Sequence, residues 1–168
     1  MARVENDRFT ARMDEPFAVF MIGMRINNPF AVKKLLPTAR AMPAMLRELY
    51  QHIEKCFLGA KFFLYWCGPA IVQYRLSFED LERFARNPDG PHLPAWQRFN
   101  REVGKDGSVG IWHETYMVER AGYEAIYSNM PPFGLAKATE RVPAVGGRET
   151  ARRRLMRGEN EPAVPSPE

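Results

Sequence analysis

The sequence predicts an α+β fold of the ferredoxin-like type, in which one antiparallel sheet carries its helices on a single face. The first observation is the order of the apolar patterns, which runs strand, helix, strand, strand, helix, helix, strand, strand. This order matches the split βαβ plan with an extra terminal strand. The second observation is composition, because 45% apolar and 12% aromatic residues in a chain of 168 can build a core. The other sheet face stays uncovered in this plan, which predicts a homodimer that packs sheet against sheet.

The first strand and helix follow from residues 17–53. Residues 17–26 form a near-continuous apolar run with a single charge, Arg25, which is typical of a buried central strand. Apolar residues then recur every three or four positions over residues 35–53, which predicts a helix. Pro43 lies inside this pattern, and we expect it to kink or split the helix.

The middle of the chain predicts a hairpin followed by two helices. Residues 58–67 and 70–76 read as strands, with Gly68 and Pro69 as the turn between them. Ser77 is a favourable N-cap for the next helix, with Asp80 three residues later. Residues 93–103 form a further helical pattern, and the last strands are expected at 109–118 and 123–127.

Domain organisation and charge point to one globular domain with polar ends. We predict an N-terminal arm at 1–15, the ferredoxin-like domain at 16–135 and a basic, partly disordered tail at 136–168. The basic charge is concentrated at residues 137–157, which carry seven basic and two acidic residues, so we expect no nucleic-acid partner. No apolar run approaches the roughly 20 residues of a membrane span, and no signal peptide or disulfide framework is recognisable. These features predict a soluble, cytoplasmic protein without a membrane partner.

His113 is the first candidate for chemistry. It lies in the middle of the predicted strand 109–118, and strand alternation places it on one face with Val109, Ile111, Thr115 and Met117. A lone imidazole among apolar neighbours is either a hydrogen-bonded structural histidine or a ligand or base. Glu114 takes the opposite face, so it cannot pair with His113 within the strand.

Arg25 and Gln73 are the other candidate site residues. Arg25 shares a strand face with Val19, Met21 and Gly23, and a buried arginine is costly without a partner. It could form a salt bridge at the strand end or donate to an anionic or polar group of a substrate. Gln73 and Arg75 likewise place polar side chains on one face of their strand.

The remaining polar residues carry weaker signals. We expect His92 to be an exposed loop or capping residue and His52 to face solvent. The three histidines have no metal-ligand spacing, and Cys56 and Cys67 do not form a Cys-x-x-Cys pair. Neither a phosphate-binding glycine loop nor a nucleophile elbow is present.

Six motifs, in order along residues 8–140, carry a resemblance to a known family. The sequence resembles the small bacterial and fungal proteins labelled monooxygenase family protein, which include a relative from the fumagillin pathway. These proteins belong with the dimeric α/β-barrel superfamily, so the resemblance implies that fold and a monooxygenase-like activity. The motifs are Ile22-Gly-Met-Arg-Ile-Asn, Ala41-Met-Pro, Ser77-Phe-Glu-Asp-Leu, His92-Leu-Pro-Ala-Trp, Gly110-Ile-Trp-His-Glu-Thr-Tyr and Asn129-Met-Pro-Pro-Phe-Gly-Leu.

A shorter similarity bears on a cofactor. Trp112-His113-Glu114, followed by Tyr123-Glu-Ala-Ile-Tyr, is similar to the stretch of haem-containing aldoxime dehydratases that supplies their proximal haem ligand. The similarity implies that His113 binds haem iron through one ring nitrogen while another group fixes the second nitrogen. Arg25 and Gln73 would then be polar groups near the substrate.

Three functional hypotheses follow from these observations. The first is a monooxygenase-like oxidoreductase that acts on a small apolar organic substrate, with His113 either as the axial ligand of haem or as the base of a cofactor-free reaction. The second is a haem-dependent lyase that dehydrates an aldoxime to a nitrile. The third is a non-catalytic dimer that binds an apolar ligand, in which His113 and Arg25 satisfy each other or a backbone group.

Overall fold

The computed structural model describes residues 3–52, 56–103 and 106–157, and these fall into two compact units. The first, here called the central unit, is Phe17–Met117. The second, here called the terminal unit, joins the described residues before 17 to those after 117. This division differs from the predicted boundaries at 15/16 and 135/136, because the two ends of the chain pair with each other.

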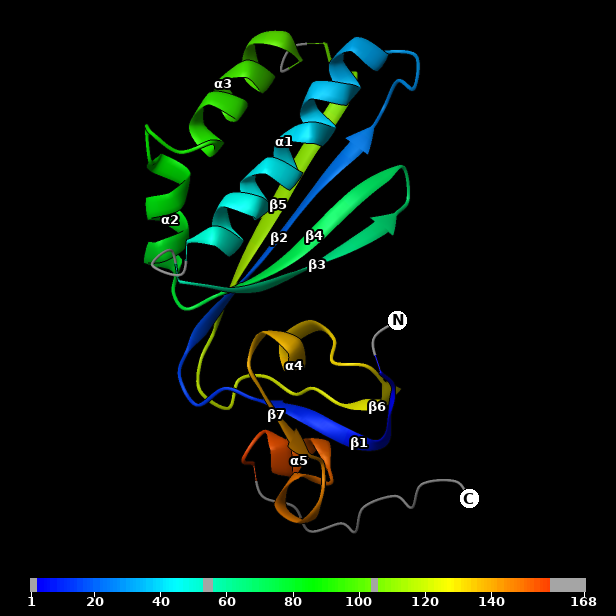
Figure 1. Cartoon of the computed structure of the whole chain (residues 1–168), viewed down its shortest axis with the longest axis vertical. Helices are drawn as coiled ribbons and strands as arrows, with labels where there is room; N and C mark the ends of the chain where they lie inside the picture. The colour runs from blue at the N-terminus through cyan, green and yellow to red at the C-terminus, as the bar shows by residue number, and fades with distance from the viewer. Residues whose placement is uncertain (1–2, 53–55, 104–105, 158–168) are drawn as a thin grey trace. The chain divides into compact units, whose positions relative to one another are not determined.

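The central unit is an antiparallel sheet with three helices on one of its faces (Figure 1). The hydrogen-bonded order of its strands is β3-β4-β2-β5, which is the strand order of the split βαβ plan. The predicted α+β, ferredoxin-like fold is therefore confirmed, and the chain by itself does not close a barrel. The elements are β2 (Phe17–Ile26), α1 (Val32–Gln51), β3 (Phe57–Tyr65), β4 (Gly68–Arg75), α2 (Phe78–Arg86), α3 (His92–Glu102) and β5 (Val109–Val118).

Local chemistry explains where α2 begins and how α1 runs. The Ser77 hydroxyl accepts a hydrogen bond from the Asp80 N–H at 3.1 Å, which is the predicted N-cap of α2. Pro43 does not split the helix. α1 runs without interruption from Val32 to Gln51 and contains both Pro37 and Pro43. Met45 and Leu49 of this helix pack with Phe84 of α2 in one buried cluster.

The hairpin turn lies two residues earlier than predicted. Tyr65 pairs with Gly68, so Trp66 and Cys67 form the turn, and Gly68 and Pro69 begin β4. Cys67, the second residue of the turn, takes a positive φ of 61°, as the corresponding position of a type II turn does. Gly68 is needed for another reason: a Cβ there would lie 1.7 Å from the carbonyl oxygen of Met24.

The terminal unit is a three-stranded sheet of order β6-β1-β7. Residues 5–12, predicted to be a loose arm, form its middle strand and bury Phe9, Thr10 and Ala11. The expected strand at 123–127 starts only at Tyr127, which pairs with Phe9 rather than with the larger sheet. The elements are β1 (Glu5–Arg12), β6 (Tyr127–Met130), α4 (Gly134–Ala138), β7 (Glu140–Pro143), the 3-10 turn η2 (Gly146–Arg148) and α5 (Ala151–Arg154).

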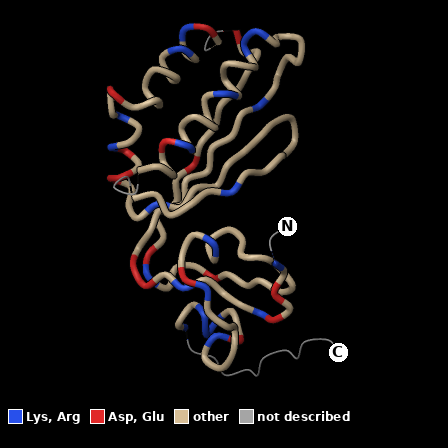
Figure 2. The backbone as a smooth tube through the Cα atoms, in the orientation of Figure 1, with Lys and Arg blue, Asp and Glu red and all other residues tan. Residues whose placement is uncertain are grey.

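The basic segment after residue 136 is folded over its described part. Arg154 donates from Nε to Glu124 at 2.7 Å, and its side chain is 7% exposed. Arg153 pairs with Glu149 at 3.4 Å. Figure 2 shows basic and acidic residues interspersed in this unit, whereas the strands of the central unit carry few charges. In the described ranges, no helix is long and apolar enough to cross a membrane.

Candidate functional site

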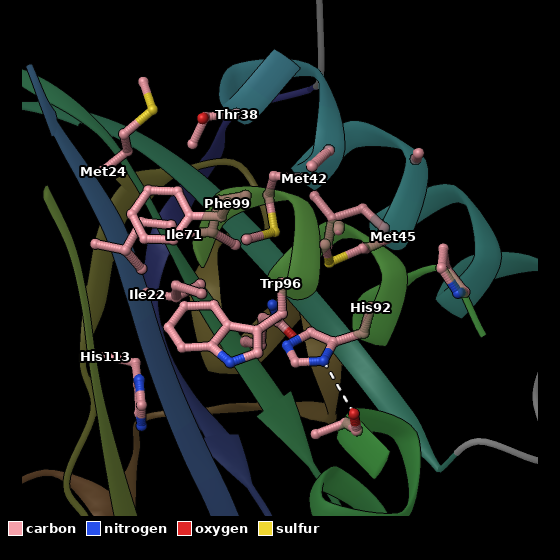
Figure 3. Close-up of a pocket in the computed structure, with 18 of the residues that line it drawn as sticks. Ile22, Met24, Thr38, Met42, Met45, Ile71, His92, Trp96, Phe99 and His113 are labelled. Carbon is pink, nitrogen blue, oxygen red and sulfur yellow. Dashed lines mark hydrogen bonds between the residues drawn. The ribbon is translucent and has the colours of Figure 1, made fainter. Parts of the chain in front are cut away.

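A large apolar pocket lies between the sheet of the central unit and its three helices (Figure 3). Its volume is about 1020 Å³, at the upper end of the roughly 300–1,000 Å³ of known ligand pockets. Side chains from β2, β4, β5, α1, α2 and α3 line it. The flexible thioethers of Met24, Met42 and Met45 contribute to its walls, which suits an irregular apolar ligand.

The sequence of α1 explains why this space is not filled. Where α1 borders the pocket, it presents several small or truncated side chains, namely Pro37, Thr38, Ala39, Ala41, Pro43 and Ala44. A helix with bulky residues at these positions would pack against the sheet and close the gap. The strands contribute alternate residues such as Phe20 and Ile22, because every second side chain points to the helix-covered face.

His113 lines the pocket from β5, together with Ile111 and Thr115. This is the face that strand alternation predicts. Its ring lies 5.7 Å from the ring of Phe20, measured between centroids. No described residue forms a hydrogen bond with the ring nitrogens of His113. The interpretation of His113 as a hydrogen-bonded structural histidine is therefore not supported within the described residues. The imidazole is exposed to the pocket and available to a ligand.

Gln73 also lines the pocket, but in a more buried place. It is 3% exposed, on the helix-facing side of β4 with Ile71 and Arg75. Its side-chain oxygen accepts a hydrogen bond from Nη2 of Arg75 at 3.1 Å. Gln73 is therefore a partner of Arg75, with which it shares one face of β4 as predicted.

Arg75 is the most unusual side chain of the site. It is 1% exposed, and its guanidinium carbon lies 5.3 Å from the ring centroid of Phe57 and 5.1 Å from that of Phe84. Such cation–π contacts stabilise a desolvated guanidinium. Burial lowers the pKa of Arg75 to about 10, with smaller opposing effects of Asp80 and Cys56.

His92 also lines the pocket, which its sequence position did not predict. It was expected in an exposed loop or cap, but it is the first residue of α3, is half-buried and lines the pocket. Its Nδ1 lies 3.0 Å from the carbonyl oxygen of Ala85 (Figure 3). Because a carbonyl can only accept, Nδ1 carries the proton, and Nε2 of the neutral ring is left as an acceptor.

Arg25 does not join this group. It is exposed and lies on the opposite side of β2 from Phe20, Ile22 and Met24. Alternation correctly grouped it with Val19 and Met21, but that face of the sheet is turned away from the pocket. The structure thus brings His113 and Gln73 to one pocket and corrects the assignment of Arg25 to it, because a strand residue cannot reach both faces.

The acidic groups that border the pocket are already paired. Glu82 accepts from Arg86 at 2.9 Å, and Glu102 lies 3.9 Å from Arg98. In the part of the chain that the structure describes, no group of three histidine, cysteine or acidic side chains could hold a metal ion. Besides these acids, the polar side chains that line the pocket are two imidazoles, two threonine hydroxyls, the amide of Gln73 and three guanidinium groups, of which only Arg75 is buried: His92, His113, Thr38, Thr115, Gln73, Arg40, Arg75 and Arg98.

The fold and this pocket define an α+β protein with an apolar pocket between its sheet and its helices. The chain belongs to the Monooxygenase af470-like family, whose pattern matches residues 17–135. That range contains every residue that lines the pocket. The family assignment agrees with the monooxygenase resemblance of the sequence motifs.

One curated relative and two solved structures illustrate the similarity. Monooxygenase af470 of Aspergillus fumigatus is 28% identical over 134 residues, which cover 74% of this chain and 46% of that protein. The chain thus spans about half the length of this relative. A dimeric protein of unknown function with a ferredoxin-like fold, from Bacteroides fragilis, matches 62% of this chain and 97% of its own at 14% identity and a TM-score of 0.42. A protein from Bacteroides thetaiotaomicron, described as a possible oxidoreductase, matches 62% and 99% at 9% identity and a TM-score of 0.41.

Proposed function

We propose that this chain is a monooxygenase-type oxidoreductase that oxidises an apolar organic substrate in the pocket of the central unit. The observation that carries the proposal is the pair of imidazoles, His92 and His113, on one large apolar pocket. A base in such a pocket can remove a proton from a weakly acidic carbon while bulk water is excluded. Membership of a monooxygenase-named family supports the same reaction class.

A cofactor-free reaction accounts for the residues that are present. His92 is the better base, since the Ala85 carbonyl fixes its tautomer and leaves Nε2 to accept a proton. Removal of a proton from an activated methylene gives a carbanion that can react with dioxygen. Overall, the methylene becomes a carbonyl as one dioxygen is consumed: one oxygen atom stays on the carbon, the other leaves as water with both methylene hydrogens, and the substrate supplies all four electrons. In this reaction His92 takes the base role that the sequence suggested for His113, and His113 serves as a second proton carrier.

A haem-dependent reaction is the second candidate. The pocket contains the types of side chain that bind haem in other proteins. The pocket has apolar walls and imidazole side chains, of which His113 would hold the iron as the sequence similarity implied. A ligand histidine usually has its other nitrogen fixed by an acceptor. Among the described residues, His92 has such an acceptor at Ala85 and His113 has none, so His92 fits the ligand role better than His113 in this respect. When bound, haem would supply the oxygen activation, and the chain would position the substrate.

A homodimer is part of this proposal, with a second copy on the sheet face that the helices leave open. Tyr116 of β5 is 51% exposed, and Phe63 of β3 is 39% exposed. Aromatic side chains on an open sheet face favour burial against another apolar surface. Sedimentation velocity of the wild type and of Tyr116→Asp tests this, with a dimer that the charge weakens as the expected result and a wild-type monomer as the contrary one.

The three histidines provide a matched test of the reaction. Two line the pocket, while His52 lies outside it beside Glu48, at 3.5 Å. Oxygen uptake with activated phenols and methylene ketones is expected from the wild type and from His52→Ala. The His92→Ala variant is expected to lose about 10²–10⁴-fold in rate. If no substrate of this kind drives oxygen uptake, the chain is not a cofactor-free oxygenase.

The visible spectrum after haem addition separates the remaining possibilities. A Soret band that disappears in His113→Ala or His92→Ala would identify the iron ligand and favour the haem reaction. Nitrile formation from an aldoxime without oxygen uptake would indicate the lyase instead. Tight binding of apolar ligands with neither reaction would indicate a binding protein.

A further inference from the structure

Arg75 has a buried charge with unused hydrogen-bond donors. Nη2 donates to Gln73, while Nε and Nη1 are buried and have no hydrogen-bond partner in the described ranges. Buried polar groups in folded proteins are nearly always paired, and charged ones are costly when they are not. An unpaired guanidinium at the base of a ligand pocket therefore requires a physical explanation.

No carboxylate of the described chain forms an ion pair or a hydrogen bond with Arg75. The charge of Asp80 favours the charged form of Arg75, but the two Asp80 oxygens accept hydrogen bonds from Ser77 at 2.8 Å and from Arg83 at 2.8 Å. The two glutamates that line the pocket pair with arginines of their own helices. The protein thus holds a cation in place without providing its anion.

We propose that the pocket binds an apolar organic acid whose carboxylate is held by Arg75. This inference rests on the proposed function, because it names the substrate class of the same pocket. Gln73 is the positioning residue: it fixes Nη2, while the rings of Phe57 and Phe84 hold the guanidinium plane. Nε and Nη1 are the donors left for the carboxylate, and because both are buried, a neighbouring side chain must shift for the ligand to reach them. The apolar body of the ligand then contacts the methionine and aromatic walls.

The charge and chemistry of the site favour a single carboxylate over other polar groups. A guanidinium has donors only, so an anionic oxygen satisfies it better than a hydroxyl, which must also place its own proton. One buried cation balances one negative charge, whereas a phosphate ester would bring a second charge into an apolar cavity. The ligand we infer is therefore a monoacid with a large apolar body.

Calorimetric titration with decanoate and with 1-decanol tests the assignment. The two probes share a chain length and differ in the anionic group. We expect the wild type to bind decanoate at least about tenfold more tightly than decanol, which is the scale of one charge-assisted hydrogen bond. Arg75→Met is expected to abolish this preference. Arg101→Met removes an exposed arginine of α3 that does not line the pocket, and it should keep the preference.

A measurement on the wild type alone covers the case in which Arg75→Met does not fold. The carboxyl carbon of [1-13C]decanoate reports its own ionisation by NMR as pH is changed. Beside Arg75 the pKa of the bound carboxyl must fall below that of free decanoate, whereas an apolar pocket without a cation would raise it. A raised pKa, or equal binding of decanoate and decanol by the wild type, overturns the inference.

These outcomes are independent of the reaction. A carboxylate preference without oxygen uptake by any substrate would retain the anion site and remove the oxygenase. Oxygen uptake with neutral substrates, together with no carboxylate preference, would retain the oxygenase and remove the anion site.

Discussion

The two units of this chain use the same kind of secondary structure for different purposes. In the central unit, a sheet with helices on one face encloses a pocket of about 1020 Å³. In the terminal unit, three short strands bury Phe9, Ala11 and Val142 in a core of small elements. The central unit is one continuous stretch of sequence, whereas the terminal unit is assembled from both ends of the chain. The pocket thus forms within one stretch of the chain, whereas the terminal unit forms only when the two ends of the chain pair with each other.

The largest expected effect comes from the core of the terminal unit. Phe9 is 4% exposed and stacks on Tyr127 with ring centroids 5.1 Å apart. Phe9→Ala should lower the free energy of unfolding of this unit by about 3–5 kcal/mol, because it leaves a cavity between β1 and β6. Hydrogen exchange is expected to show lost protection in residues 5–12 and 127–143, with residues 17–117 unchanged. Equal loss in both units would mean that they unfold as one.

A core substitution in the central unit, Leu49→Ala, is the counterpart of Phe9→Ala. Leu49 is 2% exposed and packs with Met45 and Phe84 between α1 and α2. Leu49→Ala should cost about 2–5 kcal/mol of stability and reduce protection in α1 and α2. Exchange in β1, β6 and β7 is expected to stay at the wild-type level. Protection that fell first in β1 would contradict the separation of the units.

A smaller effect compares one type of helix cap in both units. Ser77 caps α2 and Thr150 caps α5, each by accepting a backbone N–H three residues later. Ser77→Ala should cost about 1 kcal/mol, the usual value for a lost N-cap. Thr150→Ala should cost less, because α5 has four residues and contributes few helical bonds. Denaturant titration measures both, and a larger loss for Thr150→Ala would show that the end of the chain is more tightly packed than we infer.

The smallest effect concerns acid stability of the central unit. Hydrogen bonds from Lys34 and from the Ser108 N–H and hydroxyl lower the pKa of Asp106 to about 2. A lowered carboxyl pKa stabilises the fold above the ordinary pKa near 4, and this contribution is lost as pH falls towards 2. Asp106→Asn should therefore unfold at slightly higher pH than the wild type in this window and match it near pH 2. A variant that tracked the wild type across the whole window would contradict the assignment.

Local patterns predicted the central unit well. The apolar run at 17–26, the Ser77 cap and the alternation at 109–118 each depend on neighbouring residues, and each appears in the structure. The terminal unit could not be predicted in this way. Residues 5–12 are polar except at Phe9 and Ala11, and they become a strand only because β6 and β7 supply hydrogen-bond partners more than a hundred residues away.

The candidate site was predictable only in part, for a related reason. Alternation placed His113 on the pocket face, but it could not say which face of β2 the helices cover, and so Arg25 was assigned to the wrong side. His92 gave one usable signal, its position at the start of a helix beside Trp96. Arg75 gave none beyond a shared strand face with Gln73, because its burial depends on Phe57 and Phe84 from other elements.

The open side of the sheet places a constraint on how this sequence can vary. A Cβ at Gly23 would lie 2.5 Å from the indole of Trp112, whose Nε1 donates to the Tyr65 hydroxyl at 2.6 Å. Any larger residue at position 23 must displace that ring, so it is tolerated only if position 112 shrinks at the same time. Positions 23 and 112 should therefore change together among relatives that keep this sheet, and a lone replacement of Gly23 should be the rarest of the possible combinations.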